Sequence, residues 1–290
     1  MIRVLLLLLL SLLLVVPISA QAQMGGKKGG KMAQKGKKPA QPPSEALSGL
    51  EPEVAGAFFP TMATLDAMRA KGFMPTGLVP GYPLLADCPV VGSGFASRTR
   101  GDGSRRSVHY FQGQHSGMDI PVPEGTPILA MADGLVVHTS EGLNIGGIGL
   151  TLQHAPQDTG LLVWTYTEYK HLRELPDLEV GQRVRRGQAV AVAGATGTTG
   201  GYYGEAGHSH LHLAAMMSPG SGFKGKAVVI PQDGQWLDPL ALFLTPPIDT
   251  QSVAALPDDK RTVPVAYALT DGTVRPPDAR VIWPFACTPR

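Results

Sequence analysis

The feature that most constrains the fold is a series of short β-rich runs between Cys88 and Leu244, separated by glycines and prolines. Many short strands without intervening helical patterns are typical of an antiparallel sheet. We therefore predict a mainly β domain over residues 88–244. The predicted strands are residues 126–130, 134–138, 149–154, 161–167, 189–193 and 210–214.

A helical pattern precedes this β-rich region. Between residues 45 and 71, large apolar side chains recur at spacings near three and four, which is the period of an amphipathic helix. Because proline lacks a backbone N–H, Pro60 is expected to divide this helix into two short pieces. We predict a short helical lead-in over residues 45–87 that packs on the β domain.

The N-terminus has the features of an export signal. Arg3 precedes the apolar run Val4–Val16, and the small-residue pattern Ala20-Gln21-Ala22 follows it. This order is typical of a signal peptide, and the run is shorter than the ~18 residues of a membrane span. We predict a signal peptide over residues 1–22, no integral membrane span after its cleavage, and a periplasmic or extracellular location. An uncleaved anchor is the minor alternative.

Basic charge is concentrated at the start of the chain. Residues 23–44 are rich in glycine, lysine and proline and almost lack large apolar side chains, so we predict a flexible basic linker. Residues 39–290 hold 18 basic and 23 acidic side chains. The folded body is therefore mildly acidic, and no nucleic-acid partner is expected.

The chain contains two cysteines, Cys88 and Cys287. After export they would enter an oxidising compartment, where a disulfide persists. A bond between them would close a loop of about 200 residues and tie the C-terminal segment to the start of the β domain. Two buried free thiols remain the alternative, because sequence does not determine connectivity. Residues 245–290 form a proline-rich extension that is expected to pack back on the domain, with an edge strand at residues 281–283.

Histidines and one aspartate form a pattern suited to metal binding. His115 and Asp119 stand in H-S-G-M-D, whereas His210 and His212 stand in H-S-H-L-H. Because side chains alternate between the two faces of a strand, His210 and His212 should project to the same side. Two imidazoles and one carboxylate would meet the need of a catalytic zinc site for three protein ligands.

Four motifs occur in a fixed order along the chain: His115-Ser-Gly-Met-Asp119, Tyr169-Lys-His171, Gly194-Ala-Thr-Gly197 and His210-Leu-His212. Their order resembles peptidase family M23, the lysostaphin and LytM group, over residues 88–244. The resemblance implies a LytM-like antiparallel domain of the duplicated hybrid or barrel-sandwich type. It also implies that one Zn2+ is bound by His115, Asp119 and His212, and that His171 and His210 are the catalytic pair.

The function that this resemblance implies is a zinc metalloendopeptidase that hydrolyses the peptide cross-links of peptidoglycan through a zinc-activated water. Zinc lowers the pKa of its bound water towards about 7 and polarises the scissile carbonyl. One of His171 and His210 would act as general base, and the other would assist the oxyanion or the leaving amine. The alternative is a catalytically silent member that binds and activates a cell-wall amidase. The enzyme is favoured, because all five family positions are filled.

Some residues near these motifs depart from the family pattern or have more than one interpretation. Residues 201–209 form an insertion that is expected to line or cap the cleft, and Lys170 replaces the glycine before His171. Arg98 matches a family position near the cleft, with a structural ion pair as an equal alternative. His208 is either an alternative ligand or part of the insertion. His154 is expected to make a structural or substrate contact rather than a metal bond.

Overall fold

The computed structural model describes residues 50–141, 146–198, 208–225 and 228–290. The predicted signal peptide, the basic linker, the first residues of the lead-in and most of the 201–209 insertion lie outside these ranges. Within the described ranges, no helix has both the length and the apolar character needed to cross a membrane.

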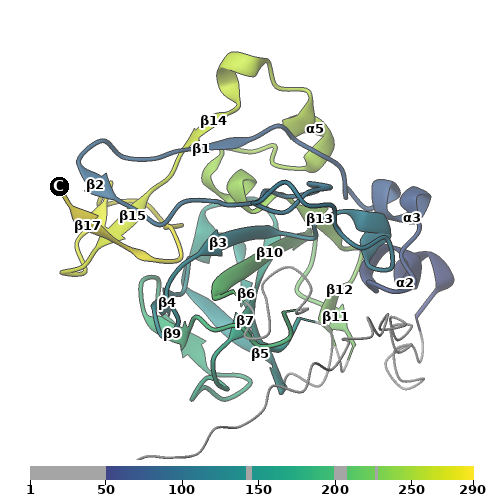
Figure 1. Cartoon of the computed structure of the whole chain (residues 1–290), viewed down its shortest axis with the longest axis horizontal. Coiled ribbons are helices and arrows are strands. Elements are labelled where there is room, and N and C mark those ends of the chain that lie inside the picture. Colours follow the sequence, from purple (N-terminus) through teal and green to yellow (C-terminus); the bar gives the residue numbers. More distant parts are fainter. Residues whose placement is uncertain (1–49, 142–145, 199–207, 226–227) are drawn as a thin grey trace, which may run out of the picture. The chain divides into compact units, whose positions relative to one another are not determined.

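The described residues form a mainly β structure with antiparallel sheets (Figure 1), which confirms the predicted fold class. The helices are α2 (Pro52–Phe58), α3 (Leu65–Ala70), α4 (Pro156–Thr159) and α5 (Thr250–Ala254), with 3-10 helices η1 (Phe111–Gly113), η2 (Pro239–Phe243) and η3 (Asp258–Lys260). The first strands are β1 (Val79–Gly81), β2 (Ala86–Asp87), β3 (Met118–Pro121), β4 (Pro127–Leu129), β5 (Gly134–Glu141), β6 (Ile148–His154), β7 (Trp164–Leu172), β8 (Arg183–Val184) and β9 (Ala189–Val192). The remaining strands are β10 (His210–Ser218), β11 (Phe223–Lys224), β12 (Ile230–Pro231), β13 (Gln235–Leu237), β14 (Thr262–Pro264), β15 (Tyr267–Leu269), β16 (Val274–Arg275) and β17 (Ala286–Pro289).

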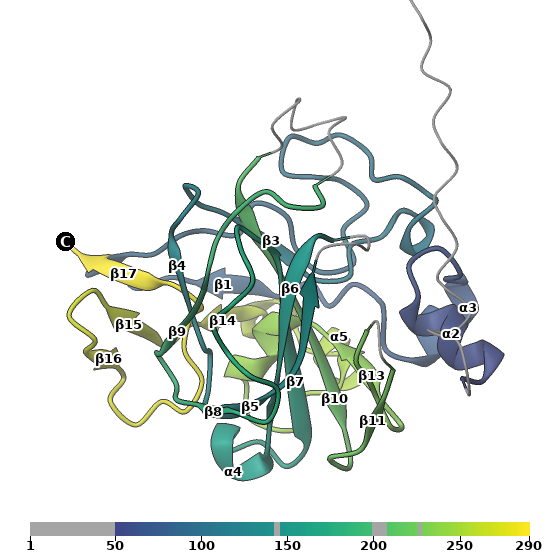
Figure 2. The same cartoon turned by 90° about the horizontal axis from the view of Figure 1, so that it is seen from below.

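A seven-stranded sheet forms the centre of the domain. Its strands run in the order β13-β10-β7-β6-β5-β8, and β3 also pairs with β10. All of these pairs are antiparallel. Figure 2 shows β6, β7 and β10 next to one another within this sheet. Strand β10 is therefore held between β7 on one side and β3 and β13 on the other.

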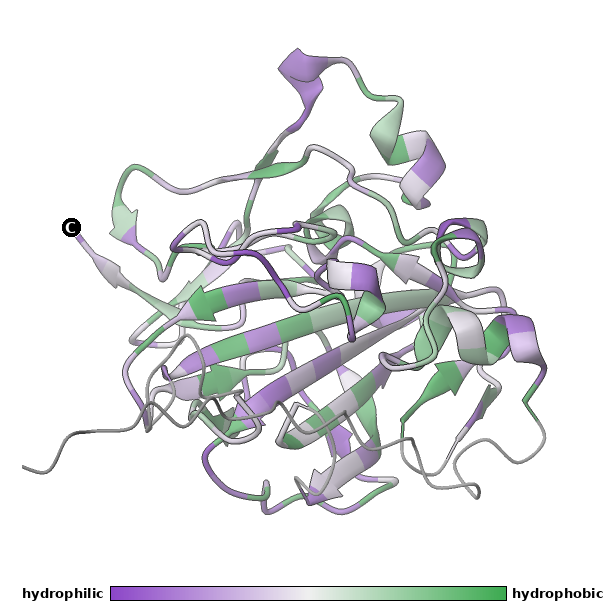
Figure 3. Ribbon diagram, turned by 45° about the vertical axis from the view of Figure 1, so that its right-hand side comes forward, coloured by the Kyte–Doolittle hydropathy of each residue, from purple (hydrophilic) through white to green (hydrophobic). Residues whose placement is uncertain are grey.

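The two faces of this sheet bury different sets of side chains. On β10, Leu211 and Leu213 belong to the larger hydrophobic cluster, whereas Ala214 belongs to a second cluster. Because strand side chains alternate, His210 and His212 share the face of Ala214, as the H-L-H spacing predicts. The alternating hydropathy along the central strands is visible in Figure 3. The histidines therefore lie on the face opposite the larger core.

The helical lead-in packs on this second face. Helix α2 ends at Phe58, two residues before Pro60, and α3 begins at Leu65, so the expected break is present. The ring of Phe58 stacks on Trp236 of β13, with ring centres 5.2 Å apart. Phe73, just after α3, contacts the same indole edge-on with ring centres 5.3 Å apart. The lead-in thus shares a hydrophobic core with the sheet.

The C-terminal extension contributes to the larger cluster. Trp283 and Phe285 are fully buried within it. Cys287 on β17 forms a disulfide with Cys88, which settles the pairing that the sequence left open. Strand β17 pairs with β15 and β2, so the disulfide reinforces a connection between the extension and the start of the β domain.

The predicted edge strand at residues 281–283 is wrong. The structure has no strand at these residues, although all three side chains are buried. The amide of Ile282 donates to the carbonyl of Met131, whereas that of Trp283 donates to the carbonyl of Ala266. Successive amides of this segment therefore bond to two different segments rather than to one neighbouring strand. The strand of this region is β17.

Candidate metal centre

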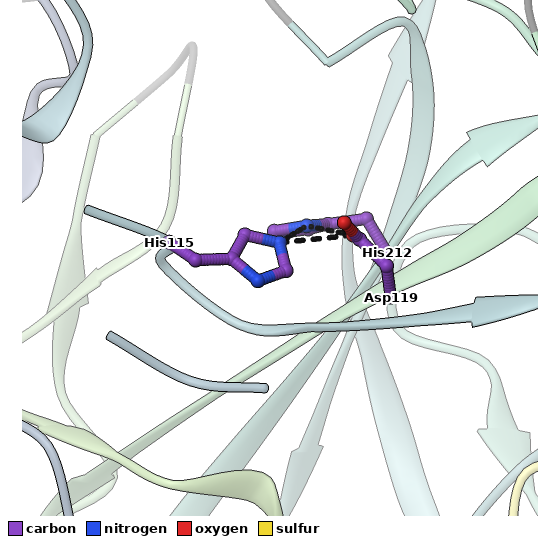
Figure 4. Close-up of side chains that lie close together, drawn as sticks. All are labelled: His115, Asp119 and His212. Carbon is purple, nitrogen blue, oxygen red and sulfur yellow. Dashed lines mark hydrogen bonds and ion pairs between the residues drawn. The ribbon is translucent and has the colours of Figure 1, made fainter. Parts of the chain in front are cut away.

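Three side chains from separate parts of the sequence converge at the histidine-bearing face. His115 precedes β3, Asp119 lies on β3, and His212 lies directly opposite Asp119 on β10. His115 Nε2 lies 2.9 Å from Asp119 Oδ1 and 3.0 Å from His212 Nδ1. His212 Nδ1 lies 3.1 Å from the same Asp119 oxygen (Figure 4). Ligand atoms around a tetrahedral zinc ion are roughly 3.3 Å apart, so this donor set fits the ion after a small expansion.

The second nitrogen of each ligand imidazole has a partner of its own. His115 Nδ1 lies 3.0 Å from the carbonyl oxygen of Gly94, to which it can only donate. A neutral His115 therefore presents an unprotonated Nε2 towards Asp119 and His212. His212 Nε2 lies 3.3 Å from Ser116 Oγ. The Gly94 carbonyl therefore fixes the tautomer and orientation of His115, whereas the Ser116 hydroxyl, which can donate or accept, helps to orient His212.

Burial favours the protonation states that a metal requires. Desolvation lowers the pKa of His115 and lowers that of His212 to about 4. Burial alone would raise the pKa of Asp119, but the charges and hydrogen bonds of His115 and His212 hold it well below its ordinary value. The site therefore offers two neutral imidazoles and one carboxylate near neutral pH.

His171 and His210 lie beside this trio. Their ring centres are 4.6 Å apart, and His210 Nε2 lies 3.6 Å from Asp119 Oδ1. His171 Nδ1 lies 2.8 Å from the carbonyl oxygen of Thr196, and His210 Nδ1 lies 2.7 Å from that of His208. Because both Nδ1 atoms face acceptors, each neutral ring keeps an unprotonated Nε2 that can accept a proton. Desolvation lowers the pKa of both rings, most strongly for His171.

A break in the strand pairing accounts for the position of His171. Ile148 of β6 pairs with Leu172, and Gly149 pairs with Lys170, so His171 is the extra residue of a bulge. Its φ of 63° lies in the left-handed region, which non-glycine residues adopt infrequently. Tyr169 and Leu172 both enter the larger core. The bulge changes the alternation between them and allows His171 to lie beside His210.

The five side chains line one cleft. Pro60 from the lead-in and Tyr110 from the loop before His115 also line it, as do Lys170 and Thr198. The lead-in is therefore part of the cleft wall as well as part of a hydrophobic core. His208 and Ser209, the described end of the insertion, stand next to His210 in the chain.

An arginine that the sequence did not single out contacts the site. Arg106 Nη2 donates to Asp119 Oδ2 at 2.8 Å. Arg98, the arginine suggested by the resemblance, is exposed. Among the described residues, the arginines that line the cleft are Arg100 and Arg106. No periodic spacing relates Arg106 to Asp119, so only the folded arrangement reveals this contact.

His208 and His154, which had more than one interpretation, are not part of the group formed by His115, Asp119 and His212. His208 is exposed and precedes β10, and among the described residues the group able to hold a metal consists of His115, Asp119 and His212. His154 is buried, with Nδ1 2.7 Å from the carbonyl oxygen of Asp133 and Nε2 2.8 Å from Thr167 Oγ1. His154 therefore has the structural role that was one of its two expected roles.

Comparison with known proteins identifies relatives of this region. Residues 113–234 match the sequence profile of peptidase family M23. The peptidoglycan DD-endopeptidase ShyA of Vibrio cholerae is 33% identical over 104 residues, which cover 36% of this chain and 20% of that protein. An uncharacterised metalloprotease of Buchnera aphidicola is 29% identical over 103 residues, covering 36% of this chain and 23% of that protein. The chain thus spans about a fifth of the length of these curated relatives.

A solved structure also matches. The catalytic domain of the antimicrobial peptidase lysostaphin from Staphylococcus simulans shares 27% sequence identity, with 38% of this chain and 72% of that chain covered and a TM-score of 0.30.

Proposed function

We propose that this chain, which carries a domain of peptidase family M23, is an exported zinc metalloendopeptidase that hydrolyses peptide cross-links of peptidoglycan. The observation that carries the proposal is the convergence of two imidazole nitrogens and one carboxylate oxygen within 4.8 Å of one another. A second pair of imidazoles lies beside them in the same cleft. Side chains able to bind a metal and side chains able to accept a proton therefore lie in the same cleft.

The geometry supports a separate role for each group of residues. His115, Asp119 and His212 would hold one zinc ion, which would activate water and polarise the scissile carbonyl. His171 and His210 present unprotonated Nε2 atoms, so either can take the proton of the attacking water. A ring that has gained this proton can donate a hydrogen bond to the developing oxyanion or pass the proton to the leaving amine.

The substrate and the location come from separate considerations. ShyA, one of the relatives, is a peptidoglycan DD-endopeptidase, which suggests peptidoglycan peptides as substrates of this chain. The signal-peptide pattern at residues 1–22 supports a location in the periplasm or outside the cell, where this polymer lies.

The decisive experiment measures bound zinc and the cleavage of purified peptidoglycan. Wild-type protein should bind about one zinc ion per chain and hydrolyse the peptide cross-links of the polymer. His212→Ala should lose both properties, whereas His109→Ala, which changes an exposed histidine, should keep them. Zinc-free wild-type protein that leaves cross-links intact but stimulates a cell-wall amidase would overturn the proposal in favour of a regulator.

A further inference from the structure

We propose that Arg106 is a positioning residue that leaves a single oxygen of Asp119 available to the metal. This inference rests on the proposed metal site. The two carboxylate oxygens of Asp119 face different partners: Oδ1 lies beside His115 and His212, whereas Oδ2 accepts from Arg106 Nη2 at 2.8 Å. Oδ1 is thus directed towards the two histidines, and Oδ2 accepts a hydrogen bond from the Arg106 guanidinium.

Arg106 is itself held in place by neighbouring groups. The same Nη2 lies 2.9 Å from Ser93 Oγ, and Nε donates to the carbonyl of Thr99 at 3.3 Å. Ser93 in turn is bridged to β3, because its carbonyl accepts from the amide of Asp119 at 2.8 Å. Only 16% of the Arg106 side chain is exposed. The guanidinium is therefore oriented by the protein itself, and through Ser93 it is connected to the same strand as its carboxylate partner.

Two effects of Arg106 on metal binding have opposite signs. Its positive charge repels a divalent cation, so loss of that charge alone would strengthen binding. Its hydrogen bond restrains a buried carboxylate, and loss of that restraint would let Asp119 rotate or bind through both oxygens. The guanidinium charge is already paired with Asp119 at 2.8 Å, which reduces its repulsion of the ion. We therefore expect the restraint to be the larger effect, so that removal of Arg106 should weaken metal binding.

The test measures affinities for Zn2+ and Co2+ by competition with a chelator, together with the visible spectrum of the Co2+ protein. Arg106→Met removes every donor but keeps much of the side-chain volume. Its metal affinity should fall roughly 10- to 100-fold, the usual effect of removing a group that orients a ligand. The Co2+ absorption should weaken, because binding through both carboxylate oxygens raises the coordination number.

Two further variants separate positioning from general damage. Arg106→Lys keeps one cationic donor and should restore part of the affinity and of the spectrum. Arg105→Gln, which changes the exposed neighbouring arginine, should match the wild type in both measurements. Ser93→Ala removes one anchor of Arg106 while the arginine remains, and it should give an intermediate loss of affinity.

The outcomes distinguish this inference from the proposed function. Arg106→Met protein that binds Co2+ at least as tightly as the wild type, with the wild-type spectrum, would overturn the positioning role and leave the metal site standing. If Arg106→Met does not fold, unchanged affinity and spectrum in both Arg106→Lys and Ser93→Ala would overturn it. Wild-type protein that takes up neither metal would overturn both proposals.

Discussion

The imidazoles of His171 and His210 face one another with ring centres 4.6 Å apart, although His171 belongs to a bulge of β7 and His210 begins β10. Each ring is oriented by a backbone carbonyl at its Nδ1 atom. The pair is therefore oriented as the proposed proton-transfer groups require, and it lies beside the three proposed metal ligands rather than among them.

Replacing either member of this pair should slow hydrolysis without releasing zinc. His171→Asn and His210→Ala should each lower kcat/KM by roughly 100- to 10,000-fold, the usual effect of losing a general acid or base. Asparagine is chosen at position 171 because it tolerates the left-handed backbone better than alanine. Cleavage of purified peptidoglycan and zinc content would be measured together. Loss of zinc from both variants would instead make these residues part of the metal site.

Zinc should stabilise the folded protein. His115, Asp119 and His212, the proposed ligands, come together only in the folded chain. A zinc ion that binds them therefore stabilises the folded state by about 3 kcal/mol when the free zinc concentration is 100 times the Kd. The melting temperature should therefore rise as zinc is added after chelation, and the rise should be abolished in His212→Ala. Thermal unfolding followed by circular dichroism provides the measurement. Equal rises in both proteins would show that zinc binds elsewhere.

Asp238 should make the protein less stable as pH increases. Burial raises the pKa of this carboxyl to about 6, against hydrogen bonds from Thr76 and the amide of Leu240. Because the folded pKa is above the unfolded value, the stabilising contribution is fully present below the unfolded pKa and is lost as pH rises through about 6. The expected loss is on the order of 1 kcal/mol between pH 5 and pH 8.

Asp238→Asn removes this titration while retaining groups able to bond Thr76 and Leu240. Urea unfolding of both proteins at pH 5 and pH 8 would measure the difference in their free energies of unfolding. A difference that stays constant between the two pH values would contradict the assignment to Asp238.

The disulfide should contribute strongly to stability. Cys88 and Cys287 are 199 positions apart in sequence, so their bond restricts the unfolded chain over most of the domain. The double variant Cys88→Ala/Cys287→Ala should lose about 2 to 5 kcal/mol of unfolding free energy. Guanidinium unfolding would measure this loss, with the reduced wild type as a matched comparison. Identical midpoints for the oxidised wild type and the double variant would contradict the prediction.

The spacing of residues along the sequence was sufficient to predict that His210 and His212 lie on one face of a strand. The shared face of His210 and His212 follows from the two-residue period of a strand, and the break near Pro60 follows from the chemistry of proline. Both features depend on residues that are close in sequence, so they can be predicted from the sequence alone.

Other features depend on contacts between distant segments. The bulge at His171 has no glycine or asparagine to indicate a left-handed backbone, and Lys170 stands before it. The contact of Arg106 with Asp119 joins a loop to a strand without a recurring spacing. Residues 281–283 combine apolar side chains as a strand would, yet their amides bond to two separate partners. Only packing of the whole domain decides these three cases.

The hydrogen bond between His115 and the carbonyl of Gly94 has a practical consequence for the choice of recombinant boundaries. A polypeptide trimmed to residues 113–234 would include every proposed metal ligand, but it would lack Gly94, whose carbonyl sets the tautomer of His115. It would also expose the apolar side chains that α2 and the C-terminal extension cover. A polypeptide that folds on its own and keeps the proposed metal site should therefore extend beyond residues 113–234 on both sides.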